Sequence, residues 1–217
     1  MRKCDAVIFD LDGTLLDTSE GIYRSVSYVM ETLGLPPVSA DIMRTFIGPP
    51  IQKSFARVYG MDKEEADKAA ALFRDRYKED DILLATPYEG IFDTINALNA
   101  TGIRTAVATY KRQDYAEKIL IHFGFDRICD AMCGSDAQGL LSKKDIIENA
   151  MRSVGVSERR RCVMVGDSDN DAAGAADIGV PFIGVTYGFG FAGKDDVDEF
   201  INIGAASSPK EILRFVL

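Results

Sequence analysis

From residue 90 to the C-terminus, apolar runs of strand length alternate with longer runs that carry apolar residues at helical spacing. This alternation predicts a parallel sheet with helices on both faces, because each parallel connection needs a crossover helix. The expected elements are a helix near 90–101, a strand over Thr105–Thr109, a helix over Asp114–Phe123, a strand near 128–133, a helix near 143–154, a strand over Cys162–Val165, a helix over 171–178, a strand over Phe182–Thr186 and a terminal helix capped by Ser208. The predicted fold class is therefore α/β, with a doubly wound parallel sheet.

Residues 18–85 carry no strand pattern and interrupt this alternation just after the first strand. The clearest helical run is Glu20–Leu33, which Gly34 and the prolines after it bring to an end. Further helical runs are expected at 39–46, 50–59 and 63–80. We therefore expect an α/β core domain made of 1–16 and 86–217, and a second, smaller all-helical cap domain over 17–85.

Composition restricts the partners and the compartment. A formal net charge of −9 argues against a nucleic-acid-binding surface, which needs a basic patch. No apolar run approaches the ~18 residues of a membrane span, and the N-terminus lacks a signal-peptide pattern. The four cysteines form neither a CxxC pair nor a disulfide framework: Cys4, Cys129, Cys133 and Cys162. We expect a soluble, cytoplasmic protein that binds neither nucleic acid nor membrane.

The strand Ala6–Phe9 is followed directly by two carboxylates, Asp10 and Asp12, and then by Gly13 and Thr14. Side chains at i and i+2 of an extended chain point to the same side, so the two carboxylates should converge. Two like charges this close need a cation or a proton between them. Gly13 permits a tight turn that leaves backbone N–H groups open to an anion. The segment predicts a nucleophilic carboxylate, a second carboxyl for proton transfer and a bound divalent metal.

Other polar residues lie beside the carboxyl ends of later strands, where open α/β sheets bind their ligands. Thr109 ends the second core strand, Lys143 begins a helix, and the strand over 162–165 runs into an acidic loop that contains Asp167 and Asp171. Together with Asp10 and Asp12, this set is suited to phosphoryl transfer through a covalent aspartyl-phosphate.

The roles follow from the chemistry of each group. Asp10 would attack phosphorus, and Asp12 would protonate the leaving oxygen and then activate water. Mg²⁺ would draw on Asp10, Asp167 and the backbone carbonyl of Asp12. Thr109 and Lys143 would hold the oxygens that are not transferred.

These motifs resemble the signature of the haloacid dehalogenase superfamily, most of whose members are Mg²⁺-dependent phosphatases. The DxDGT motif is Asp10–Thr14, the second motif is Thr109, the third is Lys143, and the fourth, GDxxxD, spans Gly166–Asp171. Ile47–Pro50, Lys111, Arg112 and Thr186–Gly190 place the closest resemblance with phosphoglycolate-phosphatase-like enzymes that carry a helical cap.

The resemblance implies a set of site residues. The catalytic residues would be Asp10, Asp12, Thr109 and Lys143; the substrate-binding residues Gly13, Thr109, Tyr110, Lys111 and Lys143; and the metal ligands Asp10, Asp12, Asp167 and Asp171. Lys144 is an alternative to Lys143, and the motif assigns no role to Asp169.

The expected function is Mg²⁺-dependent hydrolysis of a small phosphorylated metabolite, a phosphoglycolate-like phosphomonoester, by a monomer or homodimer. A pyrophosphatase, a 5'-nucleotidase or a sugar phosphomutase resembling β-phosphoglucomutase remains an alternative, because these enzymes share the motifs. A 2-haloacid dehalogenase is disfavoured, since that enzyme lacks an acid at the position of Asp12. A non-catalytic phosphoprotein-binding role has no chemical need for both Asp10 and Asp12.

Two further patterns have simpler interpretations. The acidic loop Asp167–Asp171 begins like a calcium-binding EF-hand loop, but Ala172 stands where that loop needs glycine. Residues 188–193 fit GxGxxG after a strand, yet the acids Asp195 and Asp196 that follow would repel a nucleotide phosphate. We interpret 188–193 as a flexible loop on the substrate side.

Overall fold

A computed structural model describes residues 4–217, and the chain divides into two compact units. One unit contains the chain up to Leu16 together with Pro87–Leu217, and the other is Asp17–Thr86. The strands are β1 (Ala6–Phe9), β2 (Leu16–Asp17), β3 (Thr86–Pro87), β4 (Arg104–Arg112), β5 (Ala131–Ser135), β6 (Cys162–Gly166), β7 (Phe182–Val185) and β8 (Gly204–Ala206). The short strands β2 and β3 pair with each other where the chain passes between the units.

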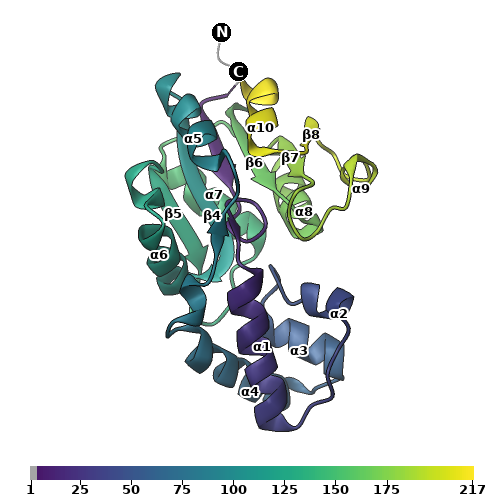
Figure 1. Cartoon of the computed structure of the whole chain (residues 1–217). Helices are drawn as coiled ribbons and strands as arrows, with labels where there is room; N and C mark the ends of the chain where they lie inside the picture. Colours follow the sequence, from purple (N-terminus) through teal and green to yellow (C-terminus); the bar gives the residue numbers. More distant parts are fainter. Residues whose placement is uncertain (1–3) are drawn as a thin grey trace. The chain divides into compact units, whose positions relative to one another are not determined.

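Six strands form one sheet in the order β5-β4-β1-β6-β7-β8, and all of its pairings are parallel (Figure 1). β1 lies inside this sheet, with Ala6 opposite Arg104 of β4 on one side and Cys162 of β6 on the other. The predicted fold class is confirmed. Because β1 is central and fully buried, the residues that follow it emerge in the middle of the carboxyl edge of the sheet.

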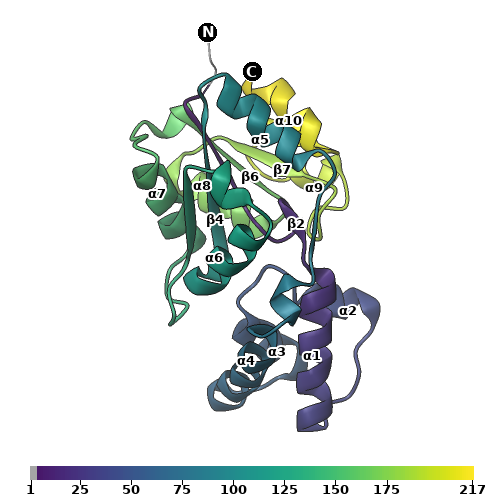
Figure 2. The ribbon, with the colours of Figure 1, turned by 60° about the vertical axis from the view of Figure 1, so that its left-hand side comes forward.

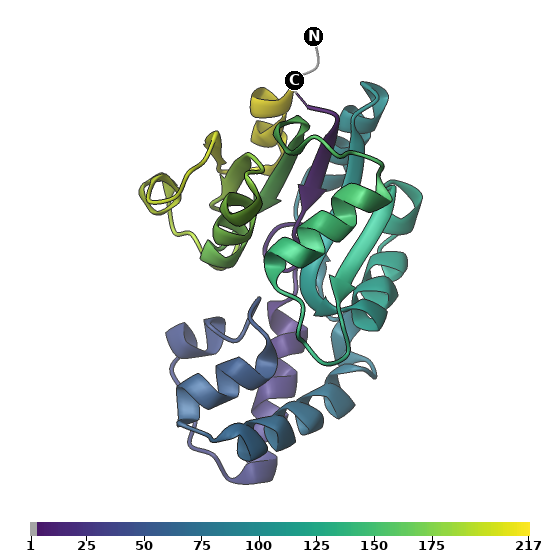
Figure 3. The same cartoon turned by 180° about the vertical axis from the view of Figure 1, so that it is seen from behind.

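Helices cover both faces of the sheet. Helices α7 and α8 lie on one face, as Figure 3 shows from behind, and α5, α6 and α10 lie on the other (Figure 1). Ala6 and Ile8 of β1 pack with Ile146 and Ile147 of α7, so alternate residues of the strand face that helix. The helices of this unit are α5 (Ile91–Ala100), α6 (Gln113–His122), α7 (Lys143–Ser153), α8 (Asp169–Ile178), α9 (Lys194–Asp198) and α10 (Pro209–Val216).

The unit Asp17–Thr86 contains helices only, apart from the ends of β2 and β3 (Figure 2). Its helices are α1 (Ser19–Leu33), α2 (Ala40–Arg44), α3 (Ile51–Tyr59), α4 (Lys63–Tyr77) and the 3-10 turn η1 (Asp81–Leu83). Gly34 ends α1 in a left-handed conformation, with φ of 63°. Asp62 and Glu65 form a reciprocal capping box that begins α4.

A buried carboxylate joins three elements of this helical unit. Asp81 of η1 is 1% exposed and accepts a hydrogen bond from Ser25 Oγ of α1 at 2.9 Å. Arg76 of α4 donates to it at 2.9 Å, and Arg24 of α1 forms an ion pair with it at 3.3 Å. Burying the carboxylate is tolerated because these cationic and hydroxyl partners replace water.

The secondary structure differs from the sequence expectations in several places. β4 continues three residues past Thr109 to Arg112, with an irregular register against β5, and the 128–133 strand begins later, at Ala131. Helix α9 and strand β8 were not expected at all. Ser208 does precede α10, but its side chain makes no capping hydrogen bond. Across residues 4–217, no helix has the length and apolarity that crossing a membrane requires.

Candidate active site

Asp10 and Asp12 lie in the turn that follows β1 and are each 5% exposed. The Asp10 N–H donates to Val165 O of β6 at 2.8 Å. This hydrogen bond continues the parallel pairing of β1 with β6 one residue beyond the end of β1. Gly13 then takes a φ of 81°, a left-handed conformation that favours glycine. A Cβ at this position would lie 2.1 Å from Oδ2 of Asp167. The turn can therefore form only because residue 13 has no side chain.

Lys143 is the first residue of α7 and reaches Asp10 across the carboxyl edge of the sheet. Its Nζ lies 2.7 Å from Asp10 Oδ1 and 2.6 Å from Asp171 Oδ1, the latter an ion pair without directed hydrogen-bond geometry. Ser142 and Asp145 form a capping box that fixes where α7 begins and therefore where Lys143 projects. Lys143 is 3% exposed, whereas Lys144 points outward and is exposed.

Three consecutive residues of β4 lie beside these groups. The buried hydroxyl of Thr109 accepts a hydrogen bond from Lys111 N at 3.1 Å. Tyr110 supports Lys143 twice: its hydroxyl accepts the Lys143 N–H at 3.0 Å, and Lys143 Nζ lies 5.6 Å from its ring centroid. Lys111 Nζ lies 3.1 Å from Asp12 Oδ1, and both side chains are buried. Asp10 and Asp12 thus pair with different lysines.

The loop from β6 into α8 supplies two further carboxylates. Asp167 is 4% exposed, and its Oδ2 accepts hydrogen bonds from the backbone N–H groups of Phe189 and Gly190. Asp171 is fully buried at the third position of α8, where its Oδ2 accepts a hydrogen bond from Ser168 Oγ at 2.7 Å. Asp169 is exposed and accepts hydrogen bonds from the adjacent Asn170. Its contacts are therefore local ones.

Asp10, Asp167 and Asp171 can present one oxygen each within 4.8 Å of one another. A buried set of carboxylate oxygens at this spacing suits a hard divalent cation rather than a soft one. The four carboxylates, with Asp12 included, face the ammonium groups of Lys111 and Lys143. Ionised together, they carry more negative charge than the two lysines balance, so the donor set fits a metal ion.

The pKa shifts reflect this excess of negative charge. Burial raises the pKa of Asp10 well above its ordinary value of 3.8, and the carboxylates of Asp171, Asp167 and Asp12 add to the rise against the lowering effect of Lys143. Burial, with Asp171, raises the pKa of Asp167 to about 7, although two backbone N–H groups and Lys143 oppose it. Burial alone would lower the pKa of Lys143, but Asp10 and Asp171 outweigh it and raise the pKa. Lys143 therefore stays protonated.

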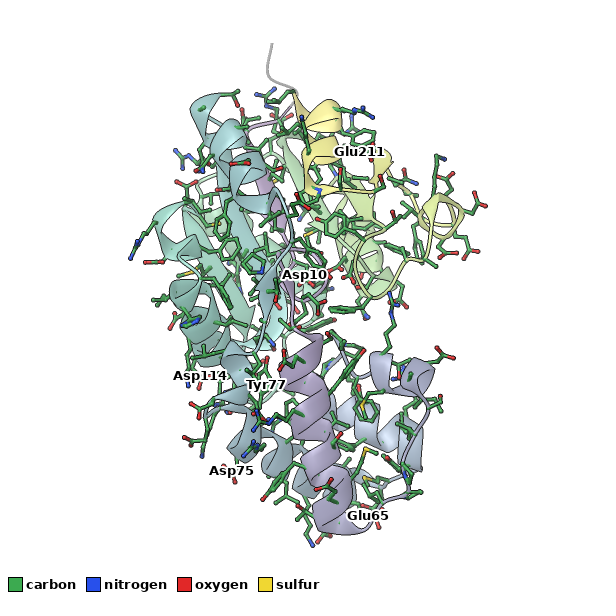
Figure 4. All side chains as sticks on the ribbon, in the orientation of Figure 1. Asp10, Glu65, Asp75, Tyr77, Asp114 and Glu211 are labelled. Atoms are coloured by element: carbon green, nitrogen blue, oxygen red, sulfur yellow. The ribbon has the colours of Figure 1, made fainter. Side chains whose placement is uncertain are left out.

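The structure brings all the site residues expected from the sequence into the core unit. Figure 4 shows Asp10 just beyond the carboxyl end of β1, among side chains that come from several strands. Sequence reasoning gave no hint that Tyr110 supports Lys143 or that the loop after β7 holds Asp167. The repeated glycines at 188, 190 and 193 were the available signal, but the same pattern also fits a flexible loop.

A parallel α/β sheet with a buried aspartate after its central strand, a lysine paired to that aspartate and an acidic loop after the next strand defines a class of enzymes. These enzymes transfer a group through an aspartate at the carboxyl edge of the sheet. The match of residues 7–185 to the haloacid dehalogenase-like hydrolase family model shows that the chain belongs to that family.

Individual relatives agree with this assignment. The chain is 37% identical over 185 residues to a 5'-nucleotidase from Pseudomonas aeruginosa, covering 85% of this chain and 83% of that protein. It is 33% identical over 195 residues to a phosphoglycolate phosphatase from Agrobacterium fabrum, covering 84% and 80% of the two chains. A crystal structure of a predicted phosphatase from Clostridium acetobutylicum superposes with a TM-score of 0.89 at 34% identity, covering 97% and 99%.

Proposed function

We propose that this chain, a phosphatase of the haloacid dehalogenase-like family, hydrolyses a small phosphomonoester such as phosphoglycolate by way of a phosphoryl group carried on Asp10. The observation that carries the proposal is the buried Asp10 carboxylate, held 2.7 Å from Lys143 Nζ at the end of the central strand. A carboxylate fixed in this way is oriented before the substrate arrives, which favours in-line attack.

The proposed reaction has two steps, and Asp10 and Asp12 act in both. An Asp10 oxygen forms a bond to phosphorus while the bond from phosphorus to the ester oxygen breaks, and Asp12 gives a proton to that leaving oxygen. Asp12, now a carboxylate, takes a proton from a water molecule, whose oxygen bonds to phosphorus and releases Asp10. The position of Asp12 two residues after Asp10, buried at the same carboxyl edge of the sheet, supports this division of roles.

Two kinds of group, a hydroxyl and two ammonium groups, would hold the oxygens that are not transferred. Thr109 accepts from the backbone through its oxygen, which leaves its hydroxyl proton for a phosphate oxygen. Lys143 supplies a positive charge next to the nucleophile, and Lys111 a second one beside Asp12. The backbone N–H of Gly13 already donates to Leu16 O at 2.9 Å, so the expected open N–H is not present there, and Gly13 would assist substrate binding by shaping the turn. Tyr110 would assist it by holding Lys143 in place.

Mg²⁺ is the metal that this oxygen-rich set would hold, with Asp10, Asp12, Asp167 and Asp171 as the proposed ligands, Asp12 through its backbone carbonyl. When bound, it would offset the repulsion between the carboxylates and an incoming phosphate. Lys143 already balances part of the charge on Asp10 and Asp171. Asp171 therefore serves the site in two ways, by facing the cation and by fixing Lys143.

The division into domains belongs to the same proposal. We assign catalysis to 1–16 and 86–217, of which the first three residues lie outside the described range, and substrate selection to a helical cap over 17–85. Support comes from the contact pattern, which separates a sheet unit from a helical unit at Leu16 and Thr86. A cytoplasmic monomer or homodimer remains our expectation for the whole protein.

Phosphate release from a panel of compounds tests the function. The panel contains phosphoglycolate, hexose 6-phosphates, nucleoside 5'-monophosphates and pyrophosphate, each assayed with MgCl2 and with EDTA. The proposal expects Mg²⁺-dependent release that favours one small phosphomonoester. Preference for pyrophosphate or for a nucleotide would replace the substrate while keeping the reaction, and isomerisation of a sugar phosphate without phosphate release would replace the reaction by that of a mutase.

A further inference from the structure

The loop after β7, residues 186–193, is directed at one of the carboxylates of the site. We call it the glycine loop. The backbone N–H of Phe189 donates to Asp167 Oδ2 at 2.7 Å, and that of Gly190 donates to the same oxygen at 3.1 Å. A third N–H, from Phe191, donates to the backbone carbonyl of Asp167 at 2.8 Å. Three successive N–H groups of one loop therefore bind a single aspartate.

This approach is possible only because the loop lacks side chains at two positions. A Cβ on Gly188 would lie 2.3 Å from Gly13 O and 2.5 Å from both Cβ and Oδ2 of Asp167. A Cβ on Gly190 would lie 2.3 Å from Asp167 O. All of these distances are far below van der Waals contact. The atoms that the added Cβ would meet belong to the backbone or to the side chain of Asp167. Gly193, three residues further on, has no atom within 4 Å of such a Cβ.

The glycine loop is also fixed at its ends. The Tyr187 hydroxyl donates to Thr14 O at 3.1 Å, and its ring packs 4.8 Å from that of Tyr88. Phe191, 5% exposed, packs between Phe182 and Phe200. The bond from Tyr187 joins the loop to the turn that carries Asp10 and Asp12. The loop thus connects the two segments that supply the carboxylates of the site.

We propose that the glycine loop is a positioning element for the metal ion: it fixes the Asp167 carboxylate by holding Oδ2 and leaves Oδ1 for the cation that Asp10 and Asp171 share. The inference rests on the proposed Mg²⁺ site. Two N–H donors on one oxygen set the rotation of the carboxylate and so the direction in which its other oxygen points. Gly188, Gly190 and Tyr187 are then positioning residues rather than catalytic ones.

Calorimetric titration of MgCl2 into metal-free protein tests this inference. The variants are Gly188→Ala, whose new methyl group displaces Asp167 or the turn at Gly13, and Gly193→Ala, a matched change in the same loop that meets nothing. We expect Gly188→Ala to raise the Kd for Mg²⁺ about 10- to 100-fold, the usual effect of disturbing a group that orients a ligand. Gly193→Ala should bind as the wild type does. Equal Kd values for all three proteins would overturn the inference.

Thermal unfolding in EDTA accompanies each titration, so that a weakened site is distinguished from a weakened fold. If Gly188→Ala does not fold, Tyr187→Phe decides, because it removes only the hydroxyl that binds Thr14 O. That variant should raise the Kd about fivefold, in line with the loss of one hydrogen bond. An unchanged Kd in a folded Tyr187→Phe protein would then overturn the inference. A wild-type protein that binds no Mg²⁺ would instead reject the proposed function itself.

Discussion

The buried carboxylates of the site differ in the groups that hold them, and this difference suggests separate roles for Asp10, Asp12 and Asp167. Asp10 contacts Lys143 and Asp12 contacts Lys111. Asp167 is held by backbone N–H groups instead of a cation. A carboxylate paired with a lysine has its charge balanced by the protein, whereas one held by backbone dipoles leaves its charge for a bound cation to balance when it ionises. We therefore place the nucleophile at Asp10 and the strongest demand for a cation at Asp167.

Substitution of the nucleophile tests the first of these assignments. Asp10→Asn keeps the size of the side chain but removes the attacking oxygen, so kcat should fall by about three orders of magnitude or more while the circular dichroism spectrum stays unchanged. Asp169→Asn is the matched control, since Asp169 is an exposed acid beside the site. Its phosphate release should stay within about twofold of the wild type. Substantial turnover by Asp10→Asn would remove Asp10 as the nucleophile.

Adjacent lysines allow a second comparison. Lys143→Met leaves Asp10 and Asp171 without their common partner and should lower kcat about 100-fold, as the loss of one charge-stabilising donor does. Lys144→Met changes an exposed side chain and should leave kcat within about twofold. Steady-state kinetics on both variants gives the answer. A larger loss for Lys144→Met than for Lys143→Met would exchange their roles.

The sequence could predict which residues meet at this edge but not how they pair. Asp10 and Asp167 follow strands, Lys143 begins a helix, and Thr109 lies in the carboxyl-terminal half of β4. Parallel topology alone brings these residues together. The choice between Lys143 and Lys144 depended on where α7 begins, which the Ser142–Asp145 capping box settles. The support that Tyr110 gives to Lys143 depends on a contact between β4 and α7, and no local pattern reports it.

At the scale of elements, the apolar content of a strand decided whether the sequence could predict it. β1, β6 and β7 are short apolar runs and are buried along their length. β8 consists of Gly204, Ala205 and Ala206, whose small side chains give no strand pattern, and its pairing with β7 forms it. β4 extends through Tyr110, Lys111 and Arg112 because pairing with β5 continues there although the residues are polar.

In the helical unit, the buried Asp81 holds η1 against α1 and α4. Asp81→Asn keeps the shape of the side chain but removes the charge that Arg76 and Arg24 contact, so the free energy of unfolding should fall by about 1–2 kcal/mol. The guanidinium groups are partly exposed, which screens the pair and keeps the loss moderate. Asp80→Asn, an exposed neighbour, should change this free energy by less than about 0.5 kcal/mol. Urea unfolding of both variants measures the difference, and equal midpoints would show that the Asp81 contacts do not stabilise the unit.

For the whole molecule, the raised pKa values couple stability to pH and to metal. The pKa of Asp167 is about 7 in the folded chain against an ordinary 3.8, and the pKa of Asp10 is raised as well. At pH values between about 4 and about 7, the folded chain therefore binds more protons at these carboxyl groups than the unfolded chain does. The free energy of unfolding of the metal-free protein should therefore fall as pH rises from about 4 to about 7.

In the proposed site, Mg²⁺ should reverse this loss, because it would bind the ionised carboxylates of the folded chain. We expect MgCl2 to raise Tm more at about pH 8 than at about pH 5.5, relative to EDTA. Scanning calorimetry with MgCl2 and with EDTA at both pH values measures this difference directly. Groups outside the metal site titrate equally in the two samples at each pH, so their effect on Tm cancels in the comparison. An equal increase in Tm at both pH values would mean that no carboxylate in the site titrates across this range.

The central claim is that a phosphoryl group passes through Asp10, and a burst experiment with Asp12→Ala tests it most directly. p-Nitrophenyl phosphate has a leaving group that needs no proton, so this variant can complete the first step with MgCl2 but lacks the base for the second. The account predicts a rapid burst of one nitrophenolate per chain, and a phosphoryl group on Asp10 in peptides from the acid-quenched protein. Slow linear release without a burst, with the Asp10 peptide unmodified or another residue phosphorylated, would contradict it.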